Sequence, residues 1–224
     1  MEEKKFASGM CFYKLFWVFL FGSLFGNYYE EILTLVVHYH YHHEFIWQLK
    51  RGVMYGPISP IYGFGALLMI LILARNKRND WKTFFYGALI GGSFEYLCSF
   101  FQEKILGTVS WDYTDEFLNI QGRTTIPFAF VWGLLALVMV KIFYPSISSI
   151  IEDLPVKFGK YLTNILIVLL CLDIFVSWGS LFRQVFRQNG YQPVTVVGKF
   201  FDKYYTDDVI RKKQENMTTF EARK

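Results

Sequence analysis

Long, continuously apolar runs constrain this chain more than any other feature of its sequence. A bilayer core about 30 Å thick needs about 20 mostly apolar residues in helical form. Runs of this kind favour helices over strands, because a helix satisfies its own backbone hydrogen bonds where water is absent. The sequence therefore predicts an all-α integral membrane protein with about five transmembrane helices. The predicted helices cover residues 12–37, 58–74, 83–106, 125–144 and 161–182.

Composition supports this class of protein. Hydrophobic residues make up 53% of the 224 residues, and charged residues make up 19%, against about 25% in soluble domains. The formal net charge of +4 is too small to favour nucleic acid as a partner, so membrane lipids are the expected surroundings. The three cysteines lie in or beside apolar runs and lack the spacing of metal ligands, so we interpret them as small apolar residues.

The chain is predicted to divide into a transmembrane domain, residues 1–185, and a polar C-terminal tail, residues 186–224. Within the tail, residues 194–205 fit an amphipathic helix at the membrane interface. The apolar face of this helix would comprise Val194, Val197, Phe201 and Tyr204. The balance of Lys and Arg between alternate loops favours a multi-pass protein of the cell membrane with a cytoplasmic N-terminus and an external C-terminus.

A glycine–glycine–glutamate pattern with a spacing of four residues occurs twice in the predicted helices. Its copies are Gly22, Gly26 and Glu30, and Gly87, Gly91 and Glu95. A Gly–Pro pair with a fixed spacing also recurs, as Gly52 with Pro57 and as Gly122 with Pro127. These repeats predict a duplicated two-helix unit followed by a fifth helix, with both copies in the same orientation.

The two repeated glutamates are the leading candidates for a polar site. Residues four apart share one helical face, and glycines on that face let another helix approach closely. An ionisable group inside the membrane is costly unless it is paired or hydrated, so it indicates a function. Glu30 and Glu95 are predicted to line one central cavity, with the alternative that Glu30 is an interfacial residue near a helix end.

Two further segments supply polar candidates. Residues 51–65 are dense in Gly and Pro and fit either a broken, re-entrant helix entry that lines a cavity or a structural helix start; Pro60 and Gly63 belong to it. Residues 102–113 alternate acidic and aromatic side chains, as in an interfacial cap or a site for a cationic or sugar-like group. The cavity candidates here and in the fifth helix are Arg51, Tyr55, Tyr62, Glu103, Trp111, Asp112, Tyr113, Arg123 and Asp173. For Asp173, a structural polar contact is the alternative.

His38, His40 and His42 form a weak candidate for a metal site. Three histidines share a face in an extended chain, and neutral imidazoles bind zinc or copper. Nothing elsewhere in the sequence completes the site, so a polar loop at the membrane edge is the preferred interpretation. The chain also lacks the phosphate-binding GxxxxGK[ST] loop and the HExxH and GxSxG motifs, so no cofactor is expected.

Short motifs occur along the chain in a specific order. The first half contains Glu30, Arg51-Gly52, Tyr55-Gly56-Pro57 and Pro60 to Gly65. The second half contains Phe94-Glu95-Tyr96-Leu97, Glu103-Lys104, Trp111-Asp112-Tyr113, Asn119 to Arg123 and Lys141 to Pro145. In this order, over residues 12–185, they resemble the CmpB-type family of ABC-transporter permeases. The resemblance adds Asn119 to the candidates and implies a multi-pass permease with a separate ATPase subunit and a homo-oligomer or second permease.

The predicted function is that of a transporter permease subunit without its own nucleotide-binding site, and whether the chain is itself an enzyme is left open. One alternative is a membrane-embedded enzyme that acts on a lipid or lipid-linked substrate, with paired carboxylates as acid and base. The other is a non-catalytic membrane partner or scaffold protein.

Overall fold

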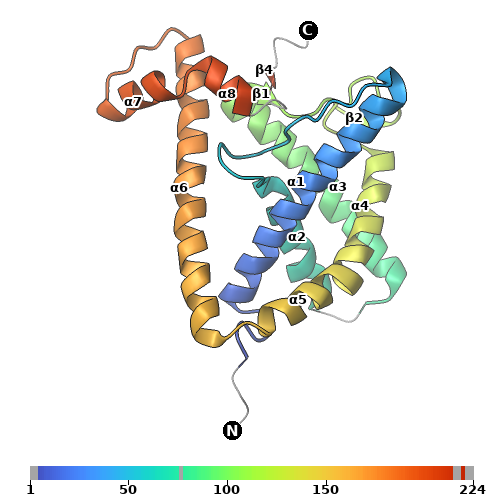
Figure 1. The fold of residues 1–224 in the computed structure, drawn as a ribbon. Helices are drawn as coiled ribbons and strands as arrows, with labels where there is room; N and C mark the ends of the chain where they lie inside the picture. Colours follow the sequence, from blue (N-terminus) through green and yellow to red (C-terminus); the bar gives the residue numbers. More distant parts are fainter. Residues whose placement is uncertain (1–4, 76–77, 214–217, 220–224) are drawn as a thin grey trace. The chain divides into compact units, whose positions relative to one another are not determined.

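The computed structural model describes residues 5–75, 78–213 and 218–219 (Figure 1). Within these residues the protein is helical apart from four strands of two residues each, so the predicted helical class is confirmed. The strands form two antiparallel pairs, β1 with β4 and β2 with β3. They are β1 Thr108–Val109, β2 Asn119–Ile120, β3 Thr124–Thr125 and β4 Thr218–Thr219. Lys77 of the basic second loop and the last part of the predicted tail lie outside the described residues.

Each of the five predicted stretches coincides with helical structure. The helices are α1 Phe12–His42, α2 Pro60–Met69, α3 Asp80–Leu106, α4 Ile126–Val138, α5 Tyr144–Glu152, α6 Val156–Gln188, α7 Val196–Tyr204 and α8 Asp207–Lys213. Two π-helical segments, η1 Ile70–Ala74 and η2 Met139–Phe143, continue α2 and α4. By length and apolar composition, Ile126–Glu152 and Val156–Gln188 are able to cross a membrane.

Many helices bury polar side chains and expose apolar ones. Buried polar side chains include Lys14, Asn27, Glu31, Thr83, Glu95, Ser99, Thr163 and Ser177. Exposed apolar side chains include Leu89, Phe101, Phe130, Leu134, Val168, Leu172 and Phe175. Proteins in water rarely expose apolar surface in large contiguous patches, whereas lipid-facing helices do so as a rule. The distribution is thus consistent with a membrane protein.

The chain forms two compact units. Unit 1 comprises Met1–Ser23, Pro60–Cys98 and Asp112–Val168, and unit 2 comprises Leu24–Ser59, Ser99–Trp111 and Leu169–Lys224. The long helices α1, α3 and α6 each contribute one part to either unit.

Two helix pairs in unit 1 pack through small residues at related positions. In the first pair, a Cβ added to Gly22 of α1 would lie 2.6 Å from the Cβ of Ala66 in α2. In the second pair, a Cβ added to Gly87 of α3 would overlap the Cβ of Ala136 in α4. Each helix pair therefore approaches so closely that a side chain at the glycine has no room.

The reverse contact also occurs in both pairs. Gly63 of α2 packs against Phe19, and a Cβ there would lie 2.7 Å from the Phe19 carbonyl oxygen. Gly133 of α4 packs against Phe84, with the corresponding distance at 2.9 Å. The glycines on α2 and α4 thus accept the backbone of the preceding helix in the same way.

The two π-helical segments meet in the core of unit 1. Ile70, the first residue of η1, is fully buried and belongs to a cluster with Met139 and Val140 around the start of η2. Leu73 packs against the same two residues from a second cluster. The two π-helical segments therefore pack directly against each other.

A buried lysine joins the start of α1 to α5 in unit 1. The Lys14 side chain has no exposed surface, and its Nζ lies 2.6 Å from Oε1 of Glu152. The same nitrogen donates to the backbone carbonyl of Ser148 at 3.2 Å. On the same helix, Trp17 Nε1 donates to Thr163 Oγ1 of α6 at 2.9 Å. These bonds tie α1 to α5 and to the first half of α6.

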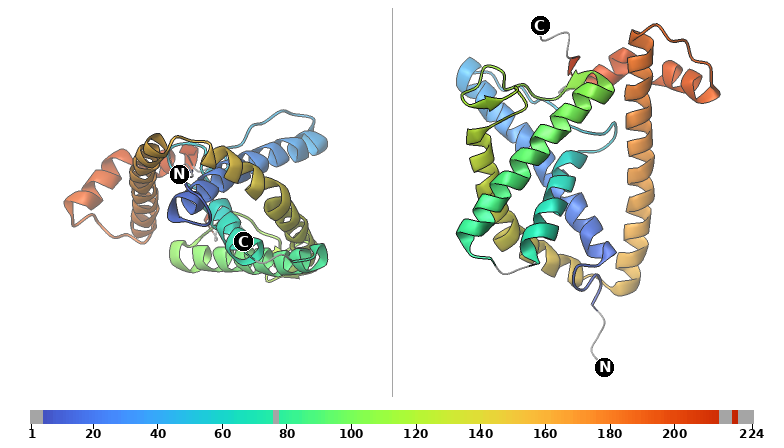
Figure 2. Two further views of the ribbon diagram at one scale, coloured as in Figure 1. Left: turned by 90° about the horizontal axis from the view of Figure 1, so that it is seen from below. Right: turned by 180° about the vertical axis from the view of Figure 1, so that it is seen from behind.

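Unit 2 is built around the second half of α6. A non-helical segment, residues 43–59, lies between α1 and α2 and buries Val53 and Met54. Met54 packs with Leu106, Leu181 and Ile210 in one apolar cluster. Beyond the end of α6 the chain continues into the short helices α7 and α8, which are visible in both views of Figure 2.

Candidate functional site

Glu95 of α3 carries the most elaborate polar site in unit 1. Its side chain is 8% exposed, and its carboxylate accepts three side-chain hydrogen bonds. Thr124 Oγ1 donates to Oε2 at 2.6 Å, Trp132 Nε1 donates to Oε2 at 3.2 Å and the Tyr113 hydroxyl donates to Oε1 at 3.2 Å. In the described part of the chain, no Lys or Arg nitrogen lies within salt-bridge distance of this carboxylate.

The three donors come from distinct parts of the second helix pair. Trp132 lies on α4, Thr124 lies on β3 and Tyr113 lies in the loop after β1. The Tyr113 ring stacks on Phe128 of α4 with centroids 4.8 Å apart, which fixes the direction of its hydroxyl. Thr125 caps α4 by accepting the backbone N–H of Phe128 at 3.0 Å. The ring stacking and the helix cap therefore hold the donors in place through contacts within the chain itself.

A buried carboxylate with only neutral donors has a specific chemical capacity. Charge in an apolar interior is costly unless it is balanced, and neutral donors balance only part of it. Such a group gains from binding a proton, a cation or a basic ligand group. The three side chains that bond Glu95 therefore supply no counter-charge to an ionised carboxylate.

The loop beside this site is held by its own side chains. Asp112 Oδ1 accepts from the backbone and the hydroxyl of Thr114 at 3.0 and 2.6 Å. Asn119 donates to the carbonyl oxygens of Thr114 and Glu116 and accepts from the Gly122 N–H at 3.0 Å. Gly122 has φ +67° and no room for a Cβ beside Thr114. Asp112 and Asn119 thus shape the loop, and Arg123 lies 5.9 Å from the Tyr96 ring centroid at its end.

In unit 2, α6 holds the Gly- and Pro-rich segment through Asp173 and Ser177. The Met54 N–H donates to Ser177 Oγ at 2.7 Å, and the Tyr55 N–H donates to Asp173 Oδ1 at 3.1 Å. Non-helical backbone inside a membrane protein needs such partners, because no bulk water is available to it. Two of the predicted candidates, Tyr55 and Asp173, are therefore brought together.

Tyr55 also joins this segment to the region after α7. Its hydroxyl lies 2.9 Å from the hydroxyl of Tyr205. Burial, together with this hydrogen bond, raises the pKa of Tyr205 to about 12, so the Tyr205 phenol stays protonated at physiological pH.

The sequence did not single out the buried polar pair on α1. Glu31, which is 2% exposed, accepts the Asn27 amide at 3.0 Å and the Lys50 N–H at 3.2 Å. Asn27 is fully buried and its Oδ1 has no hydrogen-bond partner among the described residues. The neighbouring Glu30 is only half-buried. Only the spacing of four between Asn27 and Glu31 was available as a signal in the sequence.

The other predicted residues are distributed over both units. Tyr62 lies on α2 in unit 1, whereas Glu30, Arg51, Glu103 and Trp111 lie in unit 2. Arg51 has a buried Nε without a hydrogen-bond partner in the described chain. A common cavity for Glu30 and Glu95 remains a prediction.

The histidines end α1 without forming a recognisable metal site. The rings of His38 and His42 lie 4.6 Å apart, as expected for helical residues with a spacing of four. No group of three or more His, Cys, Asp or Glu side chains suited to a metal ion occurs among the residues that the structure describes.

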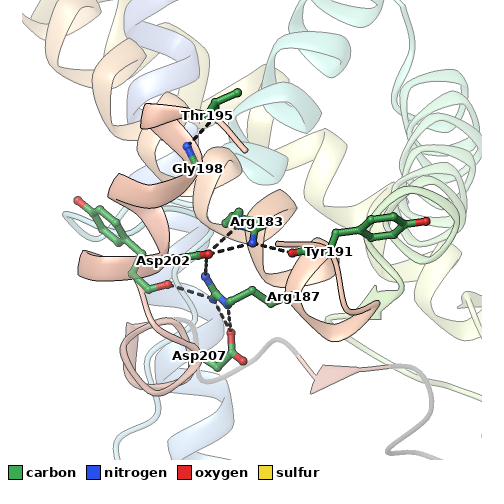
Figure 3. A network of polar contacts seen from close by, with 8 residues as sticks. Arg183, Arg187, Tyr191, Thr195, Gly198, Asp202 and Asp207 are labelled. Atoms are coloured by element: carbon green, nitrogen blue, oxygen red, sulfur yellow. Dashed lines mark hydrogen bonds and ion pairs between the residues drawn. The ribbon is translucent and has the colours of Figure 1, made fainter. Parts of the chain in front are cut away.

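A network of arginines and aspartates joins the end of α6 to α7 (Figure 3). Arg183, which is 8% exposed, donates from Nε to Asp202 Oδ1 at 2.7 Å and from Nη2 to Oδ2 at 2.9 Å. Arg187 adds a bond to Asp202 at 2.7 Å and a further bond to Asp207. Arg183 also donates to the Tyr191 carbonyl at 2.7 Å. Paired N–H···O bonds of this kind are strong and fix the orientation of both groups.

This network predicts how the docking of α7 depends on pH. The hydrogen bonds from Arg183 hold the pKa of Asp202 below its usual value of about 3.9. The stability that Asp202 contributes is therefore present above about pH 4 and is lost as the pH falls through the lower, folded-state pKa. We expect the amide protection factors of residues 196–204, which correct for the intrinsic pH dependence of exchange, to be constant between pH 5 and 7 and to fall below pH 4. Asp202→Asn should lower these protection factors at every pH.

Comparison with known proteins places the chain in a family. Residues 17–178, well over half of the chain, match the family described as "Putative ABC-transporter type IV". No curated protein and no solved structure matches the chain significantly. The matched residues include all but the first five residues of the two helix pairs, the site around Glu95 and Asp173, but end before α7. The chain therefore belongs to the ABC-transporter type IV family, as the order of its motifs predicted.

Proposed function

We propose that this protein is a membrane-embedded permease subunit of a transporter and that Glu95 forms the centre of its polar site. The observation that carries the proposal is the buried carboxylate of Glu95, which accepts hydrogen bonds from three oriented neutral donors. A group that can gain and lose a positive charge inside the membrane is typical of transport pathways. The ATP hydrolysis that the family name implies would come from a separate subunit, since the sequence has no phosphate-binding GxxxxGK[ST] loop.

We also propose that the two helix pairs, α1 with α2 and α3 with α4, are copies of one two-helix element. Gly22 and Gly87, 65 residues apart, face Ala66 and Ala136, which are 70 residues apart. Gly63 and Gly133 have the same relation to Phe19 and Phe84, and both second helices continue into π-helical turns. Glu95 in one copy corresponds to Glu30 in the other. The two helix pairs plus α6 give five transmembrane helices, with the two pairs in the same orientation.

Cysteine accessibility labelling tests the number and direction of the spans. Single cysteines at the two termini of the full chain are exposed to a membrane-impermeant maleimide in intact cells. Five spans with a cytoplasmic N-terminus predict labelling at the C-terminus alone. Labelling at both termini, or at neither, would contradict an odd number of spans, and labelling at the N-terminus alone would reverse the orientation.

Glu95→Gln is expected to abolish function while the protein still reaches the membrane. The substitution keeps the size of the side chain and one of the two accepting oxygens, replaces the other oxygen by an NH2 group, and removes the charge that the site is proposed to exchange. We expect the variant to accumulate at the normal level by immunoblot yet to fail to complement a deletion strain. Glu116→Gln, on an exposed loop residue, is the matched control and should complement. Full complementation by Glu95→Gln would exclude the proposed role.

Purification from native membranes in mild detergent distinguishes the transporter from its alternatives. A transporter subunit should be recovered with a chain that carries a phosphate-binding GxxxxGK[ST] loop, and the complex should hydrolyse ATP. Conversion of a co-purifying lipid by the isolated chain, lost in Glu95→Gln, would instead indicate a membrane enzyme. Recovery with a partner whose activity is unchanged when both Glu30 and Glu95 are replaced would indicate a non-catalytic scaffold.

A further inference from the structure

The face of α7 that points away from α6 is strongly apolar. The side chains of Val196, Val197, Phe200 and Tyr204 are all exposed, with Val196 at 85%. The spacing of four between Val196, Phe200 and Tyr204 places them along one side of the helix. Phe201, which the sequence placed on the apolar face, is instead buried against Gly179 of α6. The exposed set is therefore a second apolar surface, distinct from the contact with α6.

The arginine–aspartate network determines which face is exposed. Asp202 is held by Arg183 and Arg187, and the next residue back, Phe201, occupies the space above Gly179. Since both contacts lie on one side of a nine-residue helix, α7 cannot rotate without losing them. Thr195 caps the helix by accepting the Gly198 N–H at 3.0 Å, which fixes its beginning (Figure 3). These contacts thus fix the rotation of α7 and keep its apolar face exposed.

Neighbouring residues indicate what covers this face. Helix α6 is able to cross a membrane and ends at Gln188, seven residues before the first turn of α7. Its last turns expose Trp178 and the loop that follows exposes Tyr191, and Trp and Tyr concentrate where a membrane meets water. Lys199 and Lys203 lie beside the apolar face of α7. An amphipathic helix with lysines next to its apolar side is typical of binding to anionic lipid surfaces.

We propose that α7 is an interfacial lipid-binding element, in which Val196, Val197, Phe200 and Tyr204 enter the headgroup region of an anionic bilayer. Lys199 and Lys203 contact lipid phosphates, and Arg183 with Asp202 sets the depth and rotation of the helix. The element lies beyond the residues that the family match covers. The proposal rests on the membrane placement proposed above and is independent of transport and of Glu95.

Spin labels on the full chain test this placement. Cysteines replace Val197 and Lys199, one at a time, in a chain whose three native cysteines are changed to serine. The labelled proteins are reconstituted in vesicles of phosphatidylcholine, with or without one quarter phosphatidylglycerol. We expect the label at 197 to collide severalfold more with oxygen than with a water-soluble nickel chelate, and the label at 199 to show the reverse. Phosphatidylglycerol should increase the contrast, and Lys199→Gln with Lys203→Gln should remove that increase.

Two outcomes of the spin-label experiment would overturn the proposal. Equal, water-like access of both reagents at 197 would place the apolar face in solvent, and low access of both would mean that protein covers it, either a second copy or a partner. Amide exchange of residues 196–204 in the unmodified chain gives a second measurement that does not depend on the cysteine replacements. Exchange that is identical in the two lipid compositions would exclude contact with anionic headgroups. Cysteine labelling of the termini tests the number and direction of the spans without involving α7, which separates the two proposals.

Asp202→Asn tests the arginine–aspartate network separately from the lipid contact. Loss of the charged pair should increase the mobility of the label at 197 and reduce its oxygen contact. Asp208→Asn removes the exposed ion pair with Arg211 and serves as the matched control, with no change expected. An unchanged label in Asp202→Asn would contradict the role of the network in positioning α7.

Discussion

Replacing Glu152 by alanine is expected to lower the free energy of unfolding by about 3 kcal/mol, because it leaves a buried ammonium group without its counter-charge. The Lys14 side chain has no exposed surface, and Glu152 is its only carboxylate partner in the described chain. The bonds from Lys14 to Ser148 remain, but a serine hydroxyl and a carbonyl do not neutralise a charge. Thermal and denaturant unfolding of the purified protein in detergent measures the loss.

Two comparisons make this result specific to burial. Asp80→Asn removes the exposed ion pair with Lys141 and should cost less than about 1 kcal/mol, as is usual for surface pairs. The double variant Lys14→Met with Glu152→Leu should recover most of the loss, since apolar residues of similar volume can replace a buried ion pair without penalty. A Glu152→Ala protein as stable as its parent would show that α1 and α5 are held together by other contacts.

Gly87→Ala is expected to destabilise the protein by about 2 kcal/mol, although alanine favours helices over glycine by about 1 kcal/mol. The new methyl group would overlap the Cβ of Ala136, so α3 and α4 would have to separate. Adding Ala136→Gly should restore most of the stability, because it returns the space to the helix contact. Unfolding of the single and double variants, combined in a double-mutant cycle, measures this coupling.

Gly65→Ala is the matched control for this prediction. A Cβ at Gly65 would lie 3.6 Å from the Phe94 ring, which is ordinary contact, so the substitution should be neutral or stabilising. If the helix pairs are copies, Gly22→Ala should cost about as much as Gly87→Ala, because its Cβ meets Ala66 in the same way. A loss at Gly87 without a comparable loss at Gly22 would contradict the duplication.

The sequence predicted the helical elements well, because each depends on local properties. Long apolar runs predict helices wherever they occur, and Pro60 and Pro127 begin or lie in the first turn of α2 and α4, where a missing N–H costs nothing. The motif order was equally informative about the family, since it is a property of the chain alone. Membrane orientation and oligomeric state depend on the bilayer and on other chains, and they remain predictions.

The sequence was less informative about the sites, because hydrogen-bond partners come from distant positions in the chain. Glu95 was a candidate from its spacing, but Thr124 and Trp132 are ordinary residues until the fold brings them to its carboxylate. Asp112 and Asn119 were cavity candidates, yet their hydrogen bonds hold the loop itself. A side chain's type thus indicates that it needs a partner but does not identify the partner.

What the sequence by itself determined is the helical class, the helix positions and the family, since hydrophobic length and motif order are written along one chain. Only the tertiary structure decided that Lys14 is buried with Glu152, that Glu31 rather than Glu30 is the buried glutamate of α1, and that Phe201 packs inward on α7. On a helix that is apolar on most sides, the hydropathy of a residue does not indicate which face it occupies. Which face is buried is decided by contacts between helices that are distant in sequence, and these form only in the folded protein.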